Sequence, residues 1–356
     1  MADNNERYVA YVSTYTSGSK DKFGIKIYDV DLEKGYLIEE KDHIEITNCS
    51  YMTASHDHRH LYAITDFGVQ AHEILADGRL RVINEAPING MRGCFLSTCY
   101  DNKYIFVTGY HDGKLTVLRI NEDGSAGEIV DEIYHKGLGS VAERRFRPHI
   151  NCARMTKDNK YLCEADLGMD RVNVYDFNKK TGKLKLVDVI RSEQDSAPRH
   201  LKFSRDGKYL YIIHALKNYI DIYQYNEKSP GIPDFEKIQT ISTLSKYHDS
   251  NSAASTLRLS FDNDYLLASN AGDNSVILYS IDHLDGLIYK LFCLPISGDY
   301  PKDASFFPDN RHIVSLNHES STMTFFEVDF EKKIMMMSGK EIKVDRPNCI
   351  FFHKLS

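Results

Sequence analysis

Basic side chains stand at a fixed distance from a repeated turn, and this spacing could build an anion-binding site. Arg199 lies seven residues before an Asp-Gly turn, and Lys302 lies seven residues before an Asp-Asn turn. Arginine can hold a carboxylate or phosphate through two parallel hydrogen bonds, and lysine adds a point charge. We therefore predict that Arg199 and Lys302 form a cationic pair that binds the anionic group of a small metabolite.

Polar side chains also recur six residues before the turn and eight and nine residues after it. The strands between these positions are mainly apolar, so the polar groups gather at the strand ends. His149 lies two residues before one of these positions, and we expect it to face the same way. The alternative is that such groups cap strand ends by hydrogen bonding to backbone and water. Lys302 is one of the predicted binding residues. The others are His200, His214, Tyr110, Asn270, Asn317, Asn151 and Asp66.

The turns mark a repeat of strand, turn and strand. Asp-Gly and Asp-Asn pairs tolerate positive φ and can join two antiparallel strands tightly. A third strand and a second turn often follow, so each repeat predicts a sheet of about four strands. Successive turns are 44 to 57 residues apart, at Asp57-His58, Asp101-Asn102, Asp158-Asn159, Asp206-Gly207, Asp262-Asn263 and Asp309-Asn310.

Small antiparallel sheets repeated about every 50 residues predict a β-propeller. Six copies are clear, and a chain of 356 residues has room for seven blades. The seventh blade would combine the first strands of the chain with its last strand, which removes open sheet edges. We therefore predict an all-β fold in one domain, residues 1–356, with four strands per blade and the polar strand ends at one end of a central channel. A β-sandwich and two separate sheet domains are the alternatives.

The composition argues against nucleic acid and membranes as partners. The formal net charge is −7, which opposes a general affinity for polyanions. The chain shows no signal-peptide pattern and no run of 18 apolar residues, so we expect a cytoplasmic protein. Its seven cysteines are scattered without C-x-x-C spacing, which favours buried thiols over disulfides or a zinc site. We predict no metal or cofactor, and the sequence indicates no particular protein partner.

Several segments resemble the seven-bladed β-propeller lactonase family, which contains bacterial 6-phosphogluconolactonases and fungal carboxymuconate-lactonizing enzymes. The segment "RPHINCARMTKDNKYLCEADLGMDRVNVY" is similar to the family's Pro-His-Ala-His and Asp-Leu-Gly-x-Asp-Arg-Val blade. The segment "APRHLKFSRDGKYLYIIHALKNYIDIY" is similar to its Pro-Arg-His blade, and "RPNCIFF" to its closing strand. The resemblance covers nearly the whole chain.

The chain keeps some of the family's polar positions and replaces others. His149, Arg199, Asp166 and Tyr110 match family residues. At other positions the chain differs from the family. Asn151 stands where the family has His, Ala215 where it has Glu, and Thr256 where it has an acid. Ala271 and Lys302 each stand where the family has Arg, and His318 stands where it has Gln. The resemblance thus supports the fold more strongly than the family's chemistry.

The resemblance implies hydrolysis of a sugar-acid lactone, for which a base and a cation are needed. His149 or His318 would be the base, because histidine titrates near neutral pH. Arg199 and Lys302 would hold the oxyanion or an anionic group, and Asp166 would orient a histidine. Two alternatives remain: lactonization of an unsaturated diacid, and a non-catalytic propeller that binds a metabolite or a protein. The alanines at positions 215 and 271 favour the non-catalytic alternative.

Overall fold

The computed structural model describes residues 6–19, 22–137, 147–246 and 251–355. The chain divides into two compact units. The first unit comprises residues 1–52, 74–81 and 243–356, and the second unit comprises residues 53–73 and 82–242. The single domain over residues 1–356 stays a prediction. A charged segment, residues 137–148, is predicted from the sequence to lie over the channel mouth, and most of it lies outside the described residues.

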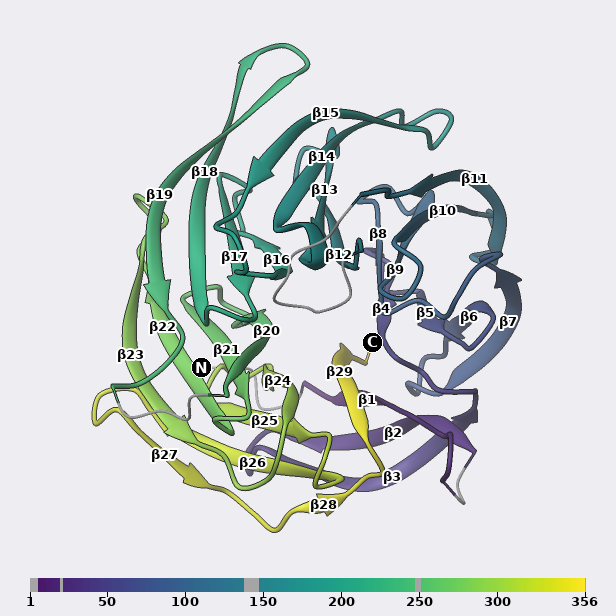
Figure 1. The fold of residues 1–356 in the computed structure, drawn as a ribbon. Coiled ribbons are helices and arrows are strands. Elements are labelled where there is room, and N and C mark those ends of the chain that lie inside the picture. Colours follow the sequence, from purple (N-terminus) through teal and green to yellow (C-terminus); the bar gives the residue numbers. More distant parts are fainter. Residues whose placement is uncertain (1–5, 20–21, 138–146, 247–250, 356) are drawn as a thin grey trace. The chain divides into compact units, whose positions relative to one another are not determined.

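The first unit contains three antiparallel sheets (Figure 1). The first sheet has the strand order β29 (Pro347–Lys354), β1 (Tyr8–Thr14), β2 (Phe23–Asp31) and β3 (Tyr36–Glu45). The second has the order β20 (Ala253–Leu259), β21 (Tyr265–Ala271), β22 (Ser275–Ile281) and β23 (Ile288–Pro295). The third has the order β24 (Pro301–Phe306), β25 (His312–Asn317), β26 (Thr322–Asp329) and β27 (Ile334–Met337). A short strand, β28 (Ile342–Lys343), also pairs with β26.

The second unit contains three further antiparallel sheets. One sheet consists of β8 (Phe95–Thr98), β9 (Tyr104–Gly109), β10 (Lys114–Ile120) and β11 (Ala126–Tyr134). The next consists of β12 (Ile150–Met155), β13 (Tyr161–Asp166), β14 (Arg171–Phe177) and β15 (Leu184–Arg191). The last consists of β16 (Pro198–Phe203), β17 (Tyr209–His214), β18 (Tyr219–Ser229) and β19 (Ile232–Ser242). A short 3-10 helix, η1 (Leu167–Met169), connects β13 to β14.

One more sheet contains residues of both units: β4 (Met52–Ala54), β5 (His60–Ile64), β6 (Gly68–Ile74) and β7 (Leu80–Pro87). The described chain therefore forms seven antiparallel sheets of four strands, with β28 as an addition to one of them. This arrangement confirms the predicted all-β, seven-bladed propeller. The last strand, β29, pairs with β1, and Phe352 lies opposite Ala10, so both ends of the chain share one blade as predicted.

The predicted turns have the expected backbone conformation. The residue after each turn Asp has a positive φ, between 54° at Asn102 and 78° at Gly207. In the turn before β17, the Asp206 carboxylate accepts hydrogen bonds from the Ser204 hydroxyl at 2.7 Å and the Lys208 amide at 3.1 Å. The aspartate therefore holds the tight turn through its own side chain, which explains its recurrence.

The second strand of each hairpin is buried on both faces. Every residue of β9, β13, β17 and β25 is buried. In the second unit, side chains of β9, β12 and β14 form one apolar cluster that includes Phe106, Met155 and Phe177. Fully buried strands are apolar along most of their length, and this leaves the strand ends as the places for polar groups.

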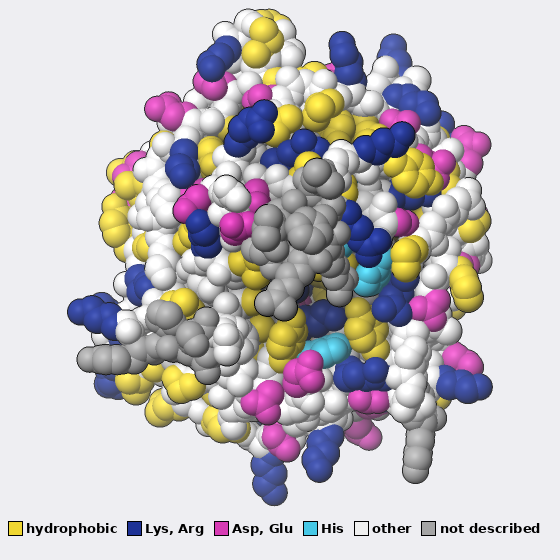
Figure 2. Space-filling model, viewed as in Figure 1, with side chains coloured by type: hydrophobic (Ala, Val, Ile, Leu, Met, Phe, Trp, Pro, Cys, Tyr) yellow, Lys and Arg dark blue, Asp and Glu magenta, His cyan; other side chains and the backbone are white. Residues whose placement is uncertain are grey.

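Charged side chains of both signs are mixed over the face drawn in Figure 2, where Lys and Arg (dark blue) lie among Asp and Glu (magenta). All seven cysteines are free, and five of them are buried, which confirms the predicted thiols without disulfides. No helix in the described part of the chain is long and apolar enough to cross a membrane.

A buried ion pair joins three strands of the first unit. The Asp303 carboxylate on β24 accepts hydrogen bonds from Arg258 Nε on β20 at 3.0 Å and from a second guanidinium nitrogen. It also accepts from the Thr256 hydroxyl at 2.8 Å and from the Ile350 amide on β29 at 3.2 Å. The side chain of Asp303 is only 4% exposed. This carboxylate therefore links the closing strand of the chain to two neighbouring sheets.

Asp303→Asn should destabilise the protein by about 3–5 kcal/mol, because it leaves the buried Arg258 charge without its counter-ion. Urea unfolding at neutral pH measures the change. Glu331→Gln, the same carboxylate-to-amide change at an exposed turn of the first unit, is the control and should stay within about 0.5 kcal/mol of wild type. Equal stability of the two variants would contradict a role for Asp303 in joining the strands.

Candidate functional site

The predicted site residues are distributed over both units. Those in the second unit are His149, Arg199, Asp166, His200, His214, Tyr110, Asn151 and Asp66, and those in the first unit are Lys302, His318, Asn270 and Asn317. The pairing of Arg199 with Lys302, which belong to different units, stays a prediction.

His149, just before β12, is held in one tautomer. Its Nδ1 lies 2.7 Å from the Tyr110 carbonyl oxygen, and a carbonyl can only accept, so Nδ1 carries a proton. Its ring stacks on the Tyr110 ring, with centroids 4.4 Å apart. Nε2 is buried and has no hydrogen-bond partner among the described residues. In the neutral ring this nitrogen has a free lone pair, which is the feature that a general base requires.

Asp166, at the end of β13, holds the backbone of His149 and the ring of a second histidine. One carboxylate oxygen accepts the His149 backbone N–H at 2.9 Å. The other accepts from Nδ1 of His135 at 2.7 Å. The sequence-based hypothesis was that Asp166 orients a histidine, and the structure brings it to the His135 ring and the His149 backbone. His135 follows β11, the outer strand of another sheet, and therefore lies outside the repeated positions from which the site was predicted.

A second carboxylate makes this cluster unusual for a protein interior. Glu164 on β13 is fully buried, and its Oε2 lies 3.2 Å from His135 Nε2 and 2.9 Å from the Asn173 amide nitrogen. His135 Nε2 also lies 2.9 Å from the Tyr175 hydroxyl. Burial raises the pKa of Glu164 to about 7, although His135 acts in the opposite direction. Burial lowers the pKa of His135, but the charges of Glu164 and Asp166 outweigh burial, so that its pKa is raised.

The sequence contained a signal for Glu164 that was missed. It stands six residues after the turn at Asp158, in the middle of a buried strand. The other repeats have an apolar or small residue there: Ala63, Val107, Ile212, Ala268 and Ser315. A single acid in an otherwise apolar column indicates a buried polar partner, because a buried charge without one is costly.

Arg199 on β16 lies beside the strand that follows His149. The Asn151 amide nitrogen on β12 donates to the Arg199 carbonyl oxygen at 3.2 Å, so the starts of the two strands are neighbours. The Arg199 side chain is half-buried, and its Nε is buried without a hydrogen-bond partner in the described ranges. Within those ranges no carboxylate forms an ion pair with Arg199. An anion brought by a ligand could fill this position.

The loop before Arg199 is held by Asp170, the second aspartate of the Asp-Leu-Gly-x-Asp motif. Its carboxylate accepts the backbone N–H groups of Asp195 and Ala197, each at 2.8 Å. Both of these residues have a φ near +60° (61° and 60°), which is uncommon outside glycine. The aspartate thereby stabilises a strained loop and sets where β16 begins.

His214, at the end of β17, belongs to a separate buried group. Its Nδ1 lies 3.1 Å from the Ser196 hydroxyl, and its Nε2 lies 3.4 Å from the Asp221 carboxylate. Ser196 and His214 are fully buried and Asp221 nearly so. These contacts connect the loop before β16 to β17 and β18, so the group is a structural network that holds the same loop as Asp170.

In the first unit, Lys302 and His318 both contact Tyr15. Lys302 Nζ lies 2.6 Å from the Asn348 amide oxygen and 4.4 Å from the centre of the Tyr15 ring. The His318 ring meets the Tyr15 ring edge-on, with centroids 5.5 Å apart. Burial, followed by the charge of Lys302, lowers the pKa of His318 to about 4. His318 is therefore neutral at physiological pH, and Lys302 supplies the positive charge here.

The remaining predicted residues have mainly local contacts. Asn270 donates to the Thr243 carbonyl at 2.8 Å, and Asn317 donates to two threonine hydroxyls of its own sheet. Asp66 forms an ion pair with Arg92 at 2.9 Å, and the His200 ring lies 5.7 Å from that of Phe95. The two asparagines match the strand-capping alternative. No group of three His, Cys, Asp or Glu side chains with a geometry for metal occurs in the described residues.

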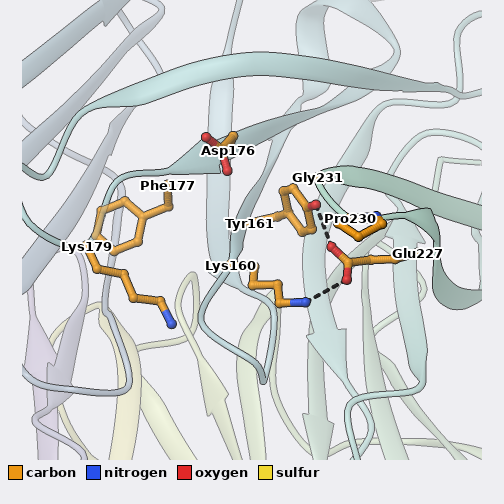
Figure 3. A pocket seen from close by; sticks show the side chains of 8 residues that line it. All are labelled: Lys160, Tyr161, Asp176, Phe177, Lys179, Glu227, Pro230 and Gly231. Carbon is orange, nitrogen blue, oxygen red and sulfur yellow. Dashed lines mark hydrogen bonds and ion pairs between the residues drawn. The ribbon is translucent and has the colours of Figure 1, made fainter.

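A pocket of about 440 Å³ lies at the other end of β13, beside the Asp158-Asn159 turn (Figure 3). Inside it, Glu227 accepts from Lys160 at 2.6 Å and from the Tyr161 hydroxyl at 2.7 Å. These charged groups neutralise one another, and we assign the pocket no function.

Comparison with known proteins identifies the class. A family model described as lactonase, 7-bladed β-propeller, matches residues 9–352, and the chain belongs to this family. It is 29% identical to a 6-phosphogluconolactonase of Bacillus subtilis, over 98% of this chain and 99% of the relative. It is 26% identical to a 6-phosphogluconolactonase of Formosa agariphila, over 94% and 96% of the two chains. A periplasmic gluconolactonase of Pseudomonas aeruginosa has the same fold, with a TM-score of 0.90 at 24% identity over 98% and 100% of the chains.

Glu164→Gln tests the buried cluster through the pH dependence of stability. Because the pKa of Glu164 is raised on folding, its contribution to stability is complete at low pH and is lost as the pH rises through about 7. The raised pKa of His135 has the same sign. Glutamine does not ionise, so the free energy of unfolding should fall less in the variant than in wild type between about pH 5 and pH 9.

Urea unfolding at a series of pH values measures this difference. Glu128→Gln, at a glutamate whose side chain is 71% exposed in the second unit, is the control and should follow the wild-type curve. Parallel curves for wild type and Glu164→Gln would show that Glu164 does not titrate in this range.

Proposed function

We propose that this protein hydrolyses the lactone of a sugar acid, with His149 as the general base and Arg199 as the group that stabilises negative charge. The proposal rests on the buried Nε2 of His149, which has no hydrogen-bond partner among the described residues and is left as the proton acceptor by the hydrogen bond of Nδ1 to Tyr110. Membership of the lactonase family supports the reaction class.

The proposed reaction needs only protein side chains and water. His149 Nε2 takes a proton from water while the water oxygen bonds to the lactone carbonyl carbon, and negative charge develops on the carbonyl oxygen. Arg199 stabilises this oxyanion or binds another anionic group of the substrate. The bond between the carbonyl carbon and the ring oxygen then breaks, and the proton on His149 passes to the leaving oxygen. The products are a carboxylic acid, which ionises, and a hydroxyl group.

Asp166 supports this proposal as a positioning residue. It accepts the His149 backbone N–H, and the Tyr110 carbonyl accepts from the ring Nδ1, so His149 is held once at its backbone and once at its ring. Lys302, in the first unit, stays a sequence-based candidate for binding an anionic group.

One observation favours a second candidate function, binding of an anionic metabolite without turnover. Ala215, which replaces the glutamate that the family resemblance implies, is 3% exposed and packs with Leu167 and Ala197. The place of an acid is therefore filled by apolar contacts. In this alternative Arg199 still binds an anion, but His149 is a structural residue.

His149→Gln should lower kcat/KM for a sugar-acid lactone by about 10²–10⁴-fold, because the base is removed. Arg199→Gln should lower it by about 10²-fold, because the oxyanion loses charge stabilisation. A pH-stat assay of acid release measures both changes, with chelator present. His283→Gln and Arg205→Gln, at exposed positions, are the matched controls and should behave as wild type.

The outcome separates the candidate functions. Wild-type turnover that His149→Gln leaves intact, with an unchanged melting temperature, would contradict the proposed base. No acid release from phosphorylated or uncharged aldonolactones, together with saturable binding of aldonates that Arg199→Gln weakens, would establish the metabolite-binding alternative.

A further inference from the structure

A histidine is buried between two carboxylates next to the proposed base. Nδ1 of His135 lies 2.7 Å from the Asp166 carboxylate, and Nε2 lies 3.2 Å from the Glu164 carboxylate. The His135 side chain is 4% exposed, and the side chains of both acids are fully buried. The proposed reaction uses one oxygen of Asp166 and uses neither His135 nor Glu164.

The contact between His135 and Glu164 requires a proton. Nε2 of His135 faces Oε2 of Glu164 at 3.2 Å, and it also lies 2.9 Å from the Tyr175 hydroxyl. An ionised carboxylate can only accept a hydrogen bond, and so can an imidazole nitrogen that carries no proton. A proton on Nε2 or on the Glu164 carboxyl group therefore turns this contact into a hydrogen bond. Without that proton, two lone pairs face each other in the protein interior.

The charges around the cluster also favour one bound proton. Among the described residues, the polar groups that face it from β14 are Arg171, opposite Asp166 in the strand ladder, Asn173, opposite Glu164, and Tyr175. With the proton bound, the positive charges of this group balance its negative charges, whichever of His135 and Glu164 carries it. Loss of the proton leaves one uncompensated negative charge in the interior, which is costly.

Asp166 connects this cluster to the proposed base. One of its oxygens accepts from Nδ1 of His135, and the other accepts the His149 backbone N–H at 2.9 Å. A carboxylate held at both oxygens has a fixed orientation. A change in the contact with His135 therefore acts on the backbone of His149 through a single side chain.

We propose that His135 is a positioning residue for His149, and that the proton shared by His135 and Glu164 is a switch that keeps Asp166 in place. While the proton is bound, His135 holds Asp166, and Asp166 holds the His149 backbone. When the proton leaves to solvent, repulsion between the two carboxylates loosens Asp166 and frees the His149 N–H. The effect on catalysis rests on the proposed lactone hydrolysis, whereas the hold on the backbone does not.

Amide hydrogen exchange of the full chain without substrate tests the switch, by mass spectrometry on peptides that contain His149. The pKa of Glu164 is raised to about 7 by burial, so the protonated form is lost as the pH rises through this value. After correction for the intrinsic rate, protection of the His149 N–H should fall about tenfold between about pH 6 and pH 8.5 in wild type. Amides of β17, in the same unit, should keep their protection, which separates local release from global unfolding.

Three variants identify the groups responsible. Glu164→Gln cannot ionise and should keep the His149 N–H protected at both pH values. His135→Asn carries an amide nitrogen near the position of Nδ1 and should also hold Asp166 at both pH values, whereas His135→Leu should lower the protection at both. His283→Asn is the matched control, because it removes the ring of an exposed pair, 2.9 Å from Asp264, and should behave as wild type.

The pH profile of turnover gives the second readout. A group that must stay protonated causes activity to fall at alkaline pH. Wild-type kcat should show this fall near pH 7, and Glu164→Gln should move it to higher pH. His135→Leu should lower kcat about tenfold or more, because a misplaced base is less effective, and His135→Asn should restore most of the loss.

Two results would overturn the proposal: equal protection of the His149 N–H at both pH values in wild type, or the same fall in Glu164→Gln as in wild type. If circular dichroism shows that His135→Leu does not fold, Glu164→Gln and His135→Asn decide the question. Exchange that follows the expected pattern without hydrolysis of any lactone would support the switch and contradict the proposed function. Lactone hydrolysis with pH-independent protection would support the function and contradict the switch.

Discussion

The burial of the second strand of each hairpin is the constraint on which the site depends. A strand covered on both faces by apolar side chains has no room for unpaired polar groups along its length. Polar chemistry is therefore confined to the strand ends, and the tight Asp turns close the opposite end of each hairpin. His149, Asp166, Arg199 and His214 all lie at such ends. The regular repeat of the strands then brings equivalent positions of neighbouring sheets together.

Glu164 is the exception to this constraint, and its surroundings show how the exception is tolerated. The carboxylate is fully buried, but His135 and Asn173 contact one of its oxygens. Through His135, the same network reaches Asp166, which holds the backbone of His149. The buried cluster and the proposed base are therefore parts of one hydrogen-bonded system.

The chain combines family membership with an altered set of polar groups. Asp170 uses both carboxylate oxygens to hold a strained loop, and Asp166 uses one oxygen to hold the backbone of His149. Ala215, in contrast, completes an apolar cluster.

The amino-acid sequence by itself determined the number of sheets, the six turns and the pairing of the chain ends, because these follow from local turn chemistry and from a repeated apolar pattern. It also predicted His149, Asp166 and Arg199 as members of one strand-end region. It did not predict His135, whose position depends on its contacts with Asp166 on β13 and Tyr175 on β14 and not on any repeat. Nor did it distinguish an asparagine that bonds within its own sheet, such as Asn317, from residues whose side-chain nitrogens lack a hydrogen-bond partner in the described ranges, such as His149 and Arg199. Only the tertiary structure decides these points, because a hydrogen bond depends on distances between residues that are far apart in the chain.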